Sequence, residues 1–165
     1  MHKITIVVLS IFLIIAITSL SFAPVDTDKS KENKHKNGLV KIKSNHNVKQ
    51  TADNAESILN NMGLTVFNRI NHAENAAKVD EELRPTELLI FGNPKIGTKL
   101  MNCSQSIAID LPQKILIWED EKENVWLAYN NPRYLARRHN IKGCNEIIKK
   151  VNKVLKKIAM DATAK

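Results

Sequence analysis

A polar segment near the N-terminus limits where this chain can form a hydrophobic core. Residues 24–37 (PVDTDKSKENKHKN) are rich in lysine and have almost no apolar side chain. Such a segment cannot bury enough apolar surface to offset the entropy of ordering, so we expect a disordered linker. The linker separates residues 1–23 from residues 38–160, which carry the apolar patterns of one α+β domain. Residues 161–165 are expected to form a short tail.

Residues 1–23 have the pattern of a secretory signal peptide. A positive start that includes Lys3 precedes a nearly continuous apolar run, and small residues at 21–23 offer a cleavage site. Two outcomes stay open, because Pro24 is a poor residue to follow a cut and the run approaches the length of a membrane span. We therefore expect an exported, periplasmic or otherwise extracytoplasmic protein, either secreted or tethered by an uncleaved membrane anchor.

The formal charge of +8 lies at the two ends of the chain. Residues 51–140 hold ten Lys and Arg against twelve Asp and Glu, so the middle of the domain is slightly acidic. A nucleic-acid-binding domain needs its positive charge on the folded binding face. We therefore expect no nucleic-acid partner. The usual motifs of serine hydrolases, zinc proteases and dinucleotide enzymes are also absent, so no cofactor is predicted.

The apolar periodicity predicts a mixture of strands and helices within residues 38–160. Strands are expected at 39–43, 64–70, 87–91, 114–118 and 125–129, and helices at Thr51 or Asp53 to Met62, 73–83, 98–109, 132–139 and 145–160. The charged turn 119–124 predicts a hairpin between the last two strands. Hairpins without regular βαβ units favour an antiparallel sheet with helices mainly on one face.

The last expected helix, 145–160, has an apolar stripe and a lysine-rich side. This pattern is typical of a helix packed on its own domain. A basic amphipathic helix on a membrane surface is the alternative, although the helix lacks the Trp or Phe that anchors such helices.

The segment 91–99 (FGNPKIGTK) resembles a phosphate-binding loop only in part. Thr98 precedes Lys99, which reverses the order of the nucleotide-binding motif, and Pro94 removes one amide donor. What remains is a helix start, with Thr98 expected as its cap and Lys95 nearby. Such a start can hold a small anion, or it is simply a capped structural turn.

Several other polar residues are candidates for a site. His72 follows an expected strand and is either a base or ligand, or a residue that caps the next helix. Glu119 and Asp120 form an acidic pair at a strand end, where carboxylates divide acid and base roles or are simply solvated. The predicted ligand-binding set is His72, Asn93, Lys95, Thr98, Met101, Glu119, Asp120, Tyr129, Asn130, Tyr134 and His139.

Cys103 and Cys144 are the only cysteines of the chain. In an exported protein they permit one disulfide, and two partly buried thiols are the alternative. Neither has the neighbours that a zinc or haem site needs, so we predict no metal.

Residues 65–77, 83–101 and 108–139 together resemble the domain of unknown function family 302. The matching motifs include Arg84-Pro85-Thr86, 91–95, Asp110-Leu111-Pro112, 118–120 and Arg138-His139. Asp80 and the stretch 102–104 depart from the family pattern. The resemblance implies an α+β fold with a curved antiparallel sheet, similar to the TATA-binding protein, and a homodimer. It implies no activity.

Three functions are compatible with these patterns. The first is a non-enzymatic ligand-binding or homodimeric assembly module of the cell envelope that uses residues 91–101, His72 and residues 129–139. The second is a small envelope enzyme with His72 as base and Glu119 or Asp120 as acid. The third is a protein associated with the membrane surface through its basic ends.

Overall fold

The computed structural model describes residues 37–165, and the expected signal segment and nearly all of the linker lie outside this range. The elements follow one another along the chain as β1 (Leu39–Lys43), α2 (Val48–Asn61), β2 (Thr65–Asn71), α3 (His72–Ala77), β3 (Thr86–Gly92), α4 (Pro94–Cys103), the 3₁₀ helix η2 (Gln105–Ile109), β4 (Gln113–Glu119), β5 (Val125–Asn130), α5 (Pro132–Arg138) and α6 (Asn145–Thr163).

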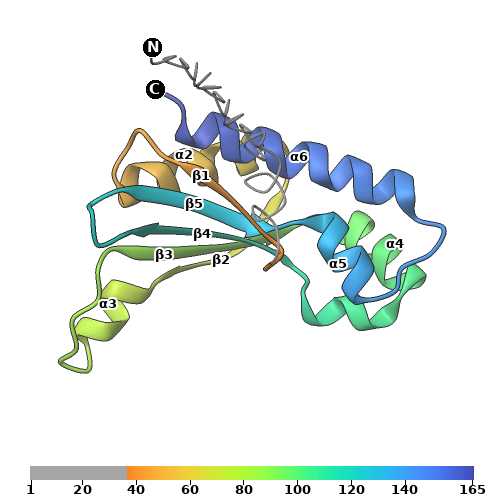
Figure 1. Ribbon diagram of the computed structural model, residues 1–165, viewed down its shortest axis with the longest axis horizontal. Coiled ribbons are helices and arrows are strands. Elements are labelled where there is room, and N and C mark those ends of the chain that lie inside the picture. Colours follow the sequence, from red (N-terminus) through yellow and green to blue (C-terminus); the bar gives the residue numbers. More distant parts are fainter. Residues whose placement is uncertain (1–36) are drawn as a thin grey trace, which may run out of the picture.

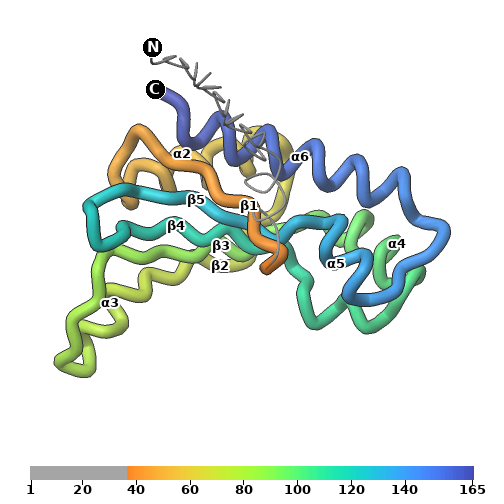
Figure 2. Tube along the Cα trace, viewed as in Figure 1, coloured from red at the N-terminus to blue at the C-terminus, as the bar shows by residue number. Residues whose placement is uncertain are grey.

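The five strands form one antiparallel sheet in the order β1-β5-β4-β3-β2. The first strand therefore pairs with the last, and Figure 2 shows the orange β1 beside the cyan β5. The hairpin between β4 and β5 pairs Trp118 with Trp126, as the charged turn predicts. These features confirm the expected α+β fold with an antiparallel sheet.

The main core lies between the sheet and two neighbouring helices, α2 and α6 (Figure 1). Alternate strand residues point into it, including Leu89, Ile115 and Leu127, which are fully buried. A second, smaller cluster joins α4, η2 and α5 to α6 around four residues, Leu100, Ile107, Leu135 and Ile148. The apolar stripe of α6 thus contributes to both clusters, which is the packed arrangement that its periodicity favours.

Two helix starts differ from the predicted ones, because asparagines cap α2 and α4 in place of Thr51 or Asp53 and of Thr98. Asn47 caps α2, and Thr51 instead lies buried inside the helix, where its hydroxyl bonds the Asn47 carbonyl. Asn93 caps α4, with Pro94 at the first helical position. The expected cap, Thr98, is an interior residue of α4.

Three helix ends also differ. The helix expected to reach 83 ends at Ala77, and Asp80 adopts a positive φ of 58° in the turn that follows. The helix expected to reach 109 breaks at Ser104, whose backbone is extended, and continues as η2. Helix α6 continues to Thr163 and so includes part of the expected tail. Within residues 37–165, no helix has both the length and the apolar character needed to span a membrane.

Candidate functional site

The N-terminus of α4 is held by a side-chain cap. The Asn93 carboxamide oxygen accepts a hydrogen bond from the Lys95 backbone N–H at 3.0 Å. Lys95 and Thr98 are exposed on this helix. The helix start that the sequence singles out is therefore real, but Asn93 performs the capping role predicted for Thr98.

A cavity of about 540 Å³ lies beside α4, between the two hydrophobic clusters. We call it the α4 groove. Helix α4, the C-terminal end of α2, the adjoining ends of β2, β3 and β4, and the middle of α6 form its walls. Its lining includes Met62, Leu64, Phe67, Phe91, Gly92, Asn93, Ile96, Gly97, Thr98, Leu100, Met101, Leu111, Pro112, Gln113, Lys150, Val151, Val154 and Leu155. Three predicted site residues, Asn93, Thr98 and Met101, are thus brought together here.

Two glycines contribute to the space in the α4 groove. A Cβ added at Gly97 meets no atom within 4 Å, and a Cβ added at Gly92 lies 3.5 Å from the Phe67 ring. Met62 and Phe67 on the groove wall are 38% and 51% exposed, which is unusual for such large apolar side chains. The groove is therefore an apolar hollow that residues 37–165 leave unfilled.

His72 and the Glu119–Asp120 pair lie at the ends of strands that are not neighbours in the sheet. His72 follows β2 and Glu119 ends β4, and β3 runs between these strands, which places their backbones roughly 10 Å apart. The Asp120 carboxylate accepts bonds from the Trp126 indole N–H at 2.7 Å and from the backbone N–H groups of Asn124 and Lys122. These bonds, that of Trp126 foremost, hold the pKa of Asp120 well below its usual range. Asp120 therefore stabilises the hairpin turn.

The remaining aromatic candidates serve packing. Tyr129 is 3% exposed in the main core, and burial raises the pKa of its phenol. Asn130 ends β5 opposite Leu39 of β1. Tyr134 packs its ring against the backbone of Gly38 at the start of the domain.

His139 belongs to a polar cluster that the sequence analysis did not identify. Its Nε2 lies 2.6 Å from Oδ2 of Asp110, and its Nδ1 lies 3.0 Å from the Ser106 hydroxyl. Ser104 donates to the His139 carbonyl at 3.0 Å. The cluster fastens η2 to the end of α5. In the sequence, the cluster is indicated only by the family resemblance, because Asp110 and His139 each lie in a motif that matches the family.

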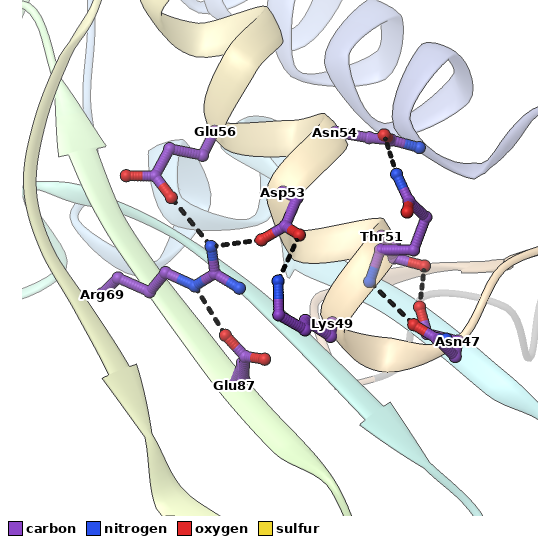
Figure 3. A network of polar contacts seen from close by, with 9 residues as sticks. Asn47, Lys49, Thr51, Asp53, Asn54, Glu56, Arg69 and Glu87 are labelled. Atoms are coloured by element: carbon purple, nitrogen blue, oxygen red, sulfur yellow. Dashed lines mark hydrogen bonds and ion pairs between the residues drawn. The ribbon is translucent and has the colours of Figure 1, made fainter.

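A second network centres on Arg69 of β2 (Figure 3). Its guanidinium bonds Glu87 at 2.6 Å, Asp53 at 2.7 Å and Glu56 at 2.9 Å. These hydrogen bonds, that to Glu87 foremost, raise the pKa of Arg69. A polar hollow lies beside the network and is lined in part by Lys49. Because each acid already pairs with Arg69, the network joins α2 to the sheet rather than offering free ligands.

The side of the sheet opposite α2 and α6 carries a further apolar surface, which we call the open face. The cross-strand register places its members together as Ile70, Leu88, Ile90, Leu116, Trp118, Trp126 and Ala128, with Lys41 on the neighbouring strand. The Lys41 ammonium lies 4.7 and 4.6 Å from the ring centres of Trp118 and Trp126. Apart from the small, buried Ala128, the apolar members are half-buried and belong to neither hydrophobic cluster.

Cys103 and Cys144 form a disulfide. It joins the last residue of α4 to the residue before α6, and the two Cα atoms are 6.5 Å apart. Helices α4 and α6, which form two walls of the α4 groove, are therefore covalently linked at one end.

Comparisons with known proteins place these features in a family. The family model for "Domain of unknown function DUF302" matches residues 40–158. The crystal structure of an uncharacterised conserved protein DUF302 from Bacillus stearothermophilus is similar, with a TM-score of 0.68 and 17% identity over 77% of this chain and 98% of that one. At that identity the likeness shows the fold.

Two curated relatives are named fluoride-specific ion channel FluC 1. The proteins of Brucella suis and Brucella abortus are each 43% identical to this chain over 104 residues. The match covers 63% of this chain but 41% and 38% of those relatives. The chain therefore spans about two fifths of the length of the curated relatives it matches.

Proposed function

This chain belongs to the DUF302 family, and we propose that it is an exported cell-envelope domain that acts by association rather than catalysis, with a second copy of itself as its partner. The observation that carries the proposal is the open face. Half-buried tryptophan and aliphatic side chains gather there, and α2 and α6 both lie on the other side of the sheet (Figure 1). Burying such a surface against a protein partner is favourable, and large aromatic side chains are enriched in interfaces.

The open face alone is too small to form a stable dimer interface. Five strands about 4.8 Å apart and about six residues long present roughly 400 Å² of flat surface. A stable interface buries about 800 Å² on each partner. A second surface of the same chain must therefore join the interface.

We assign that role to the α3 arm, residues 72–85. The arm projects from the β2 and β3 end of the sheet (Figure 1), and none of the residues of α3 is buried. Its apolar residues Val79 and Leu83 are 68% and 50% exposed. In a two-fold dimer each arm packs on the open face of the partner, so both exposed surfaces are covered at once.

The charges of the two surfaces are complementary. The arm carries Asp80, Glu81 and Glu82 in succession, and none of them forms an ion pair within residues 37–165. The open face presents Lys41 and Lys43 on its edge strand β1, with the Lys41 ammonium over the two tryptophan rings. Opposite charges across an interface fix its register and disfavour other partners.

The test is a charge-reversal experiment on the exported chain, read as the dimer dissociation constant by sedimentation. Lys41→Glu should weaken the dimer at least roughly tenfold, because an acidic arm then meets an acidic face. Reversing Asp80, Glu81 and Glu82 to Lys should do the same. A mixture of the two variants should form a tight mixed dimer, since both of its arm–face contacts are again matched.

The control is Lys153→Glu, the same change of charge on exposed α6, which should leave the dimer intact. A monomeric wild-type chain would overturn the proposal, and so would a mixture that dimerises no better than its components. Thermal unfolding of each variant separates a loss of association from a loss of folding.

Two further observations support the non-enzymatic, envelope setting. The Asp120 carboxylate is engaged in its hairpin turn and β3 runs between the strands of His72 and Glu119, and both features favour association over acid–base catalysis by these residues. The relatives' name, an ion channel, is that of a membrane protein. A membrane setting fits the expected apolar N-terminal segment of this chain.

Protease protection in intact cells, followed by mass measurement of the mature chain, tests export and cleavage.

A further inference from the structure

We infer that the α4 groove is a binding site for an amphipathic anion with a single apolar chain, such as a medium-chain carboxylate. The groove lies on the helix-covered side of the sheet, whereas the proposed dimer uses the opposite face. The inference therefore does not depend on dimerisation.

The inner wall of the groove selects an apolar ligand. It is formed by side chains from both hydrophobic clusters, among them Phe91, Leu100 and Leu155. The exposed wall residues Met62 and Phe67 leave apolar surface in contact with water. Covering such surface with a ligand is favourable, because apolar area is removed from water. An apolar chain in the groove would cover this exposed surface.

The volume of the groove sets the size of the ligand. A dry cavity of about 150 Å³ holds one benzene molecule. The groove, at about 540 Å³, is more than three times larger. A linear chain of about twelve carbons with its head group is therefore a suitable probe.

The positive charge of Lys150 in the groove lining favours a ligand with an anionic head group. Lys150 is the only charged residue in the lining, and no aspartate or glutamate lines it within the described chain. Thr98 and Gln113 add polar groups from α4 and β4. An anionic head near Lys150 gains an attractive interaction and meets no carboxylate, whereas a cationic head is repelled.

The experiment is calorimetric titration of the exported chain with three twelve-carbon probes below their micelle concentrations: dodecanoate, dodecanol and dodecyltrimethylammonium. We expect one dodecanoate to bind per chain, with weaker binding of dodecanol and the weakest binding of the cation. Equal affinity for all three probes would overturn the assignment of the anionic head. Failure of all three to bind would overturn the site.

Two pairs of variants locate the binding. Gly97→Leu fills open space in the groove without straining a helical backbone, and it should abolish dodecanoate binding. Lys99→Leu, on the same helix but outside the lining, should bind as the wild type does. Lys150→Glu should weaken dodecanoate binding roughly three- to tenfold and reduce the preference over dodecanol, whereas Lys153→Glu should do neither. Unchanged binding by Gly97→Leu would show that the ligand sits elsewhere.

Discussion

The His139 imidazole bonds the Asp110 carboxylate at 2.6 Å, and the two side chains are only 7% and 12% exposed. They lie on different elements, so their contact fixes η2 against α5. Replacing either by Ala leaves a shielded polar partner and should cost about 1–3 kcal/mol in the free energy of unfolding. The double variant should cost less than the sum of the two. Urea denaturation of all four proteins measures the coupling, and strict additivity would show that the contact contributes nothing.

Arg69 pairs with all three carboxylates of its network. Arg69→Leu leaves Glu87, whose side chain is 8% exposed, without its partner. We expect a loss of about 3 kcal/mol or more in unfolding free energy, because an unpaired charge is then buried. Lys49→Leu is the matched control. The Lys49 ammonium also bonds Asp53, but its side chain is 79% exposed, so the loss should stay below about 1 kcal/mol.

The same network predicts a response to acid. Hydrogen bonds from Lys49 and then Arg69 lower the pKa of Asp53 in the folded protein. The ionised Asp53 carboxylate therefore contributes its full stabilisation above its unfolded pKa of about 3.9. This contribution is lost as the pH falls through the lower pKa that Asp53 has in the folded protein. Unfolding midpoints should decline below about pH 4 in the wild type. Asp53→Asn should be less stable at neutral pH and show a flatter acid decline, and an unchanged decline would exclude Asp53 as a source.

The disulfide predicts a reductant-sensitive stability. Cys103 and Cys144 are 41 residues apart. Cross-linking a loop of that length restricts the unfolded chain by about 4 kcal/mol in the entropic description. Reduction should lower the unfolding free energy of the wild type by up to about this amount. A variant with both cysteines changed to Ser should already be less stable and should not respond to reductant.

Adding a single methyl group at Gly38 should strongly lower the stability of the fold. Its φ is 76°, and an added Cβ meets the Tyr134 ring. Gly38→Ala should therefore cost more than the roughly 1–2 kcal/mol of a left-handed backbone alone. Gly143→Ala is the control, because its φ is 78° but nothing lies within 4 Å of its added Cβ. Equal losses in the two variants, measured by thermal unfolding, would contradict a steric role for Tyr134.

Local patterns in the sequence predicted most of the fold. The β4–β5 hairpin follows from alternating residues around a charged turn, and the buried stripe of α6 follows from its helical periodicity. The caps of α2 and α4 are harder to predict, since Asn47 and Asn93 compete with Thr51, Asp53 and Thr98, which are also accepted at N-caps. The break at Ser104 has no strong local signal, because no Gly or Pro stands there.

The candidate site was predictable only where its residues lie close together in the chain. Asn93, Thr98 and Met101 were found because one segment carries them to the groove. The groove's other walls come from α2 and α6, and their contribution depends on tertiary packing. Asp110 and His139 are 29 positions apart in the sequence, so a local sequence pattern does not predict their contact.

The pairing of β1 with β5 has a consequence for synthesis. Residues 39–43 are the first strand of the sheet to leave the ribosome, yet their partners are residues 126–130. Long-range pairs of this kind form late, because a long loop must close before the contact is gained. A product that stops before Val125 leaves both β1 and the far side of β4 without a partner. Truncated chains therefore expose two unpaired strand edges to proteases and to one another.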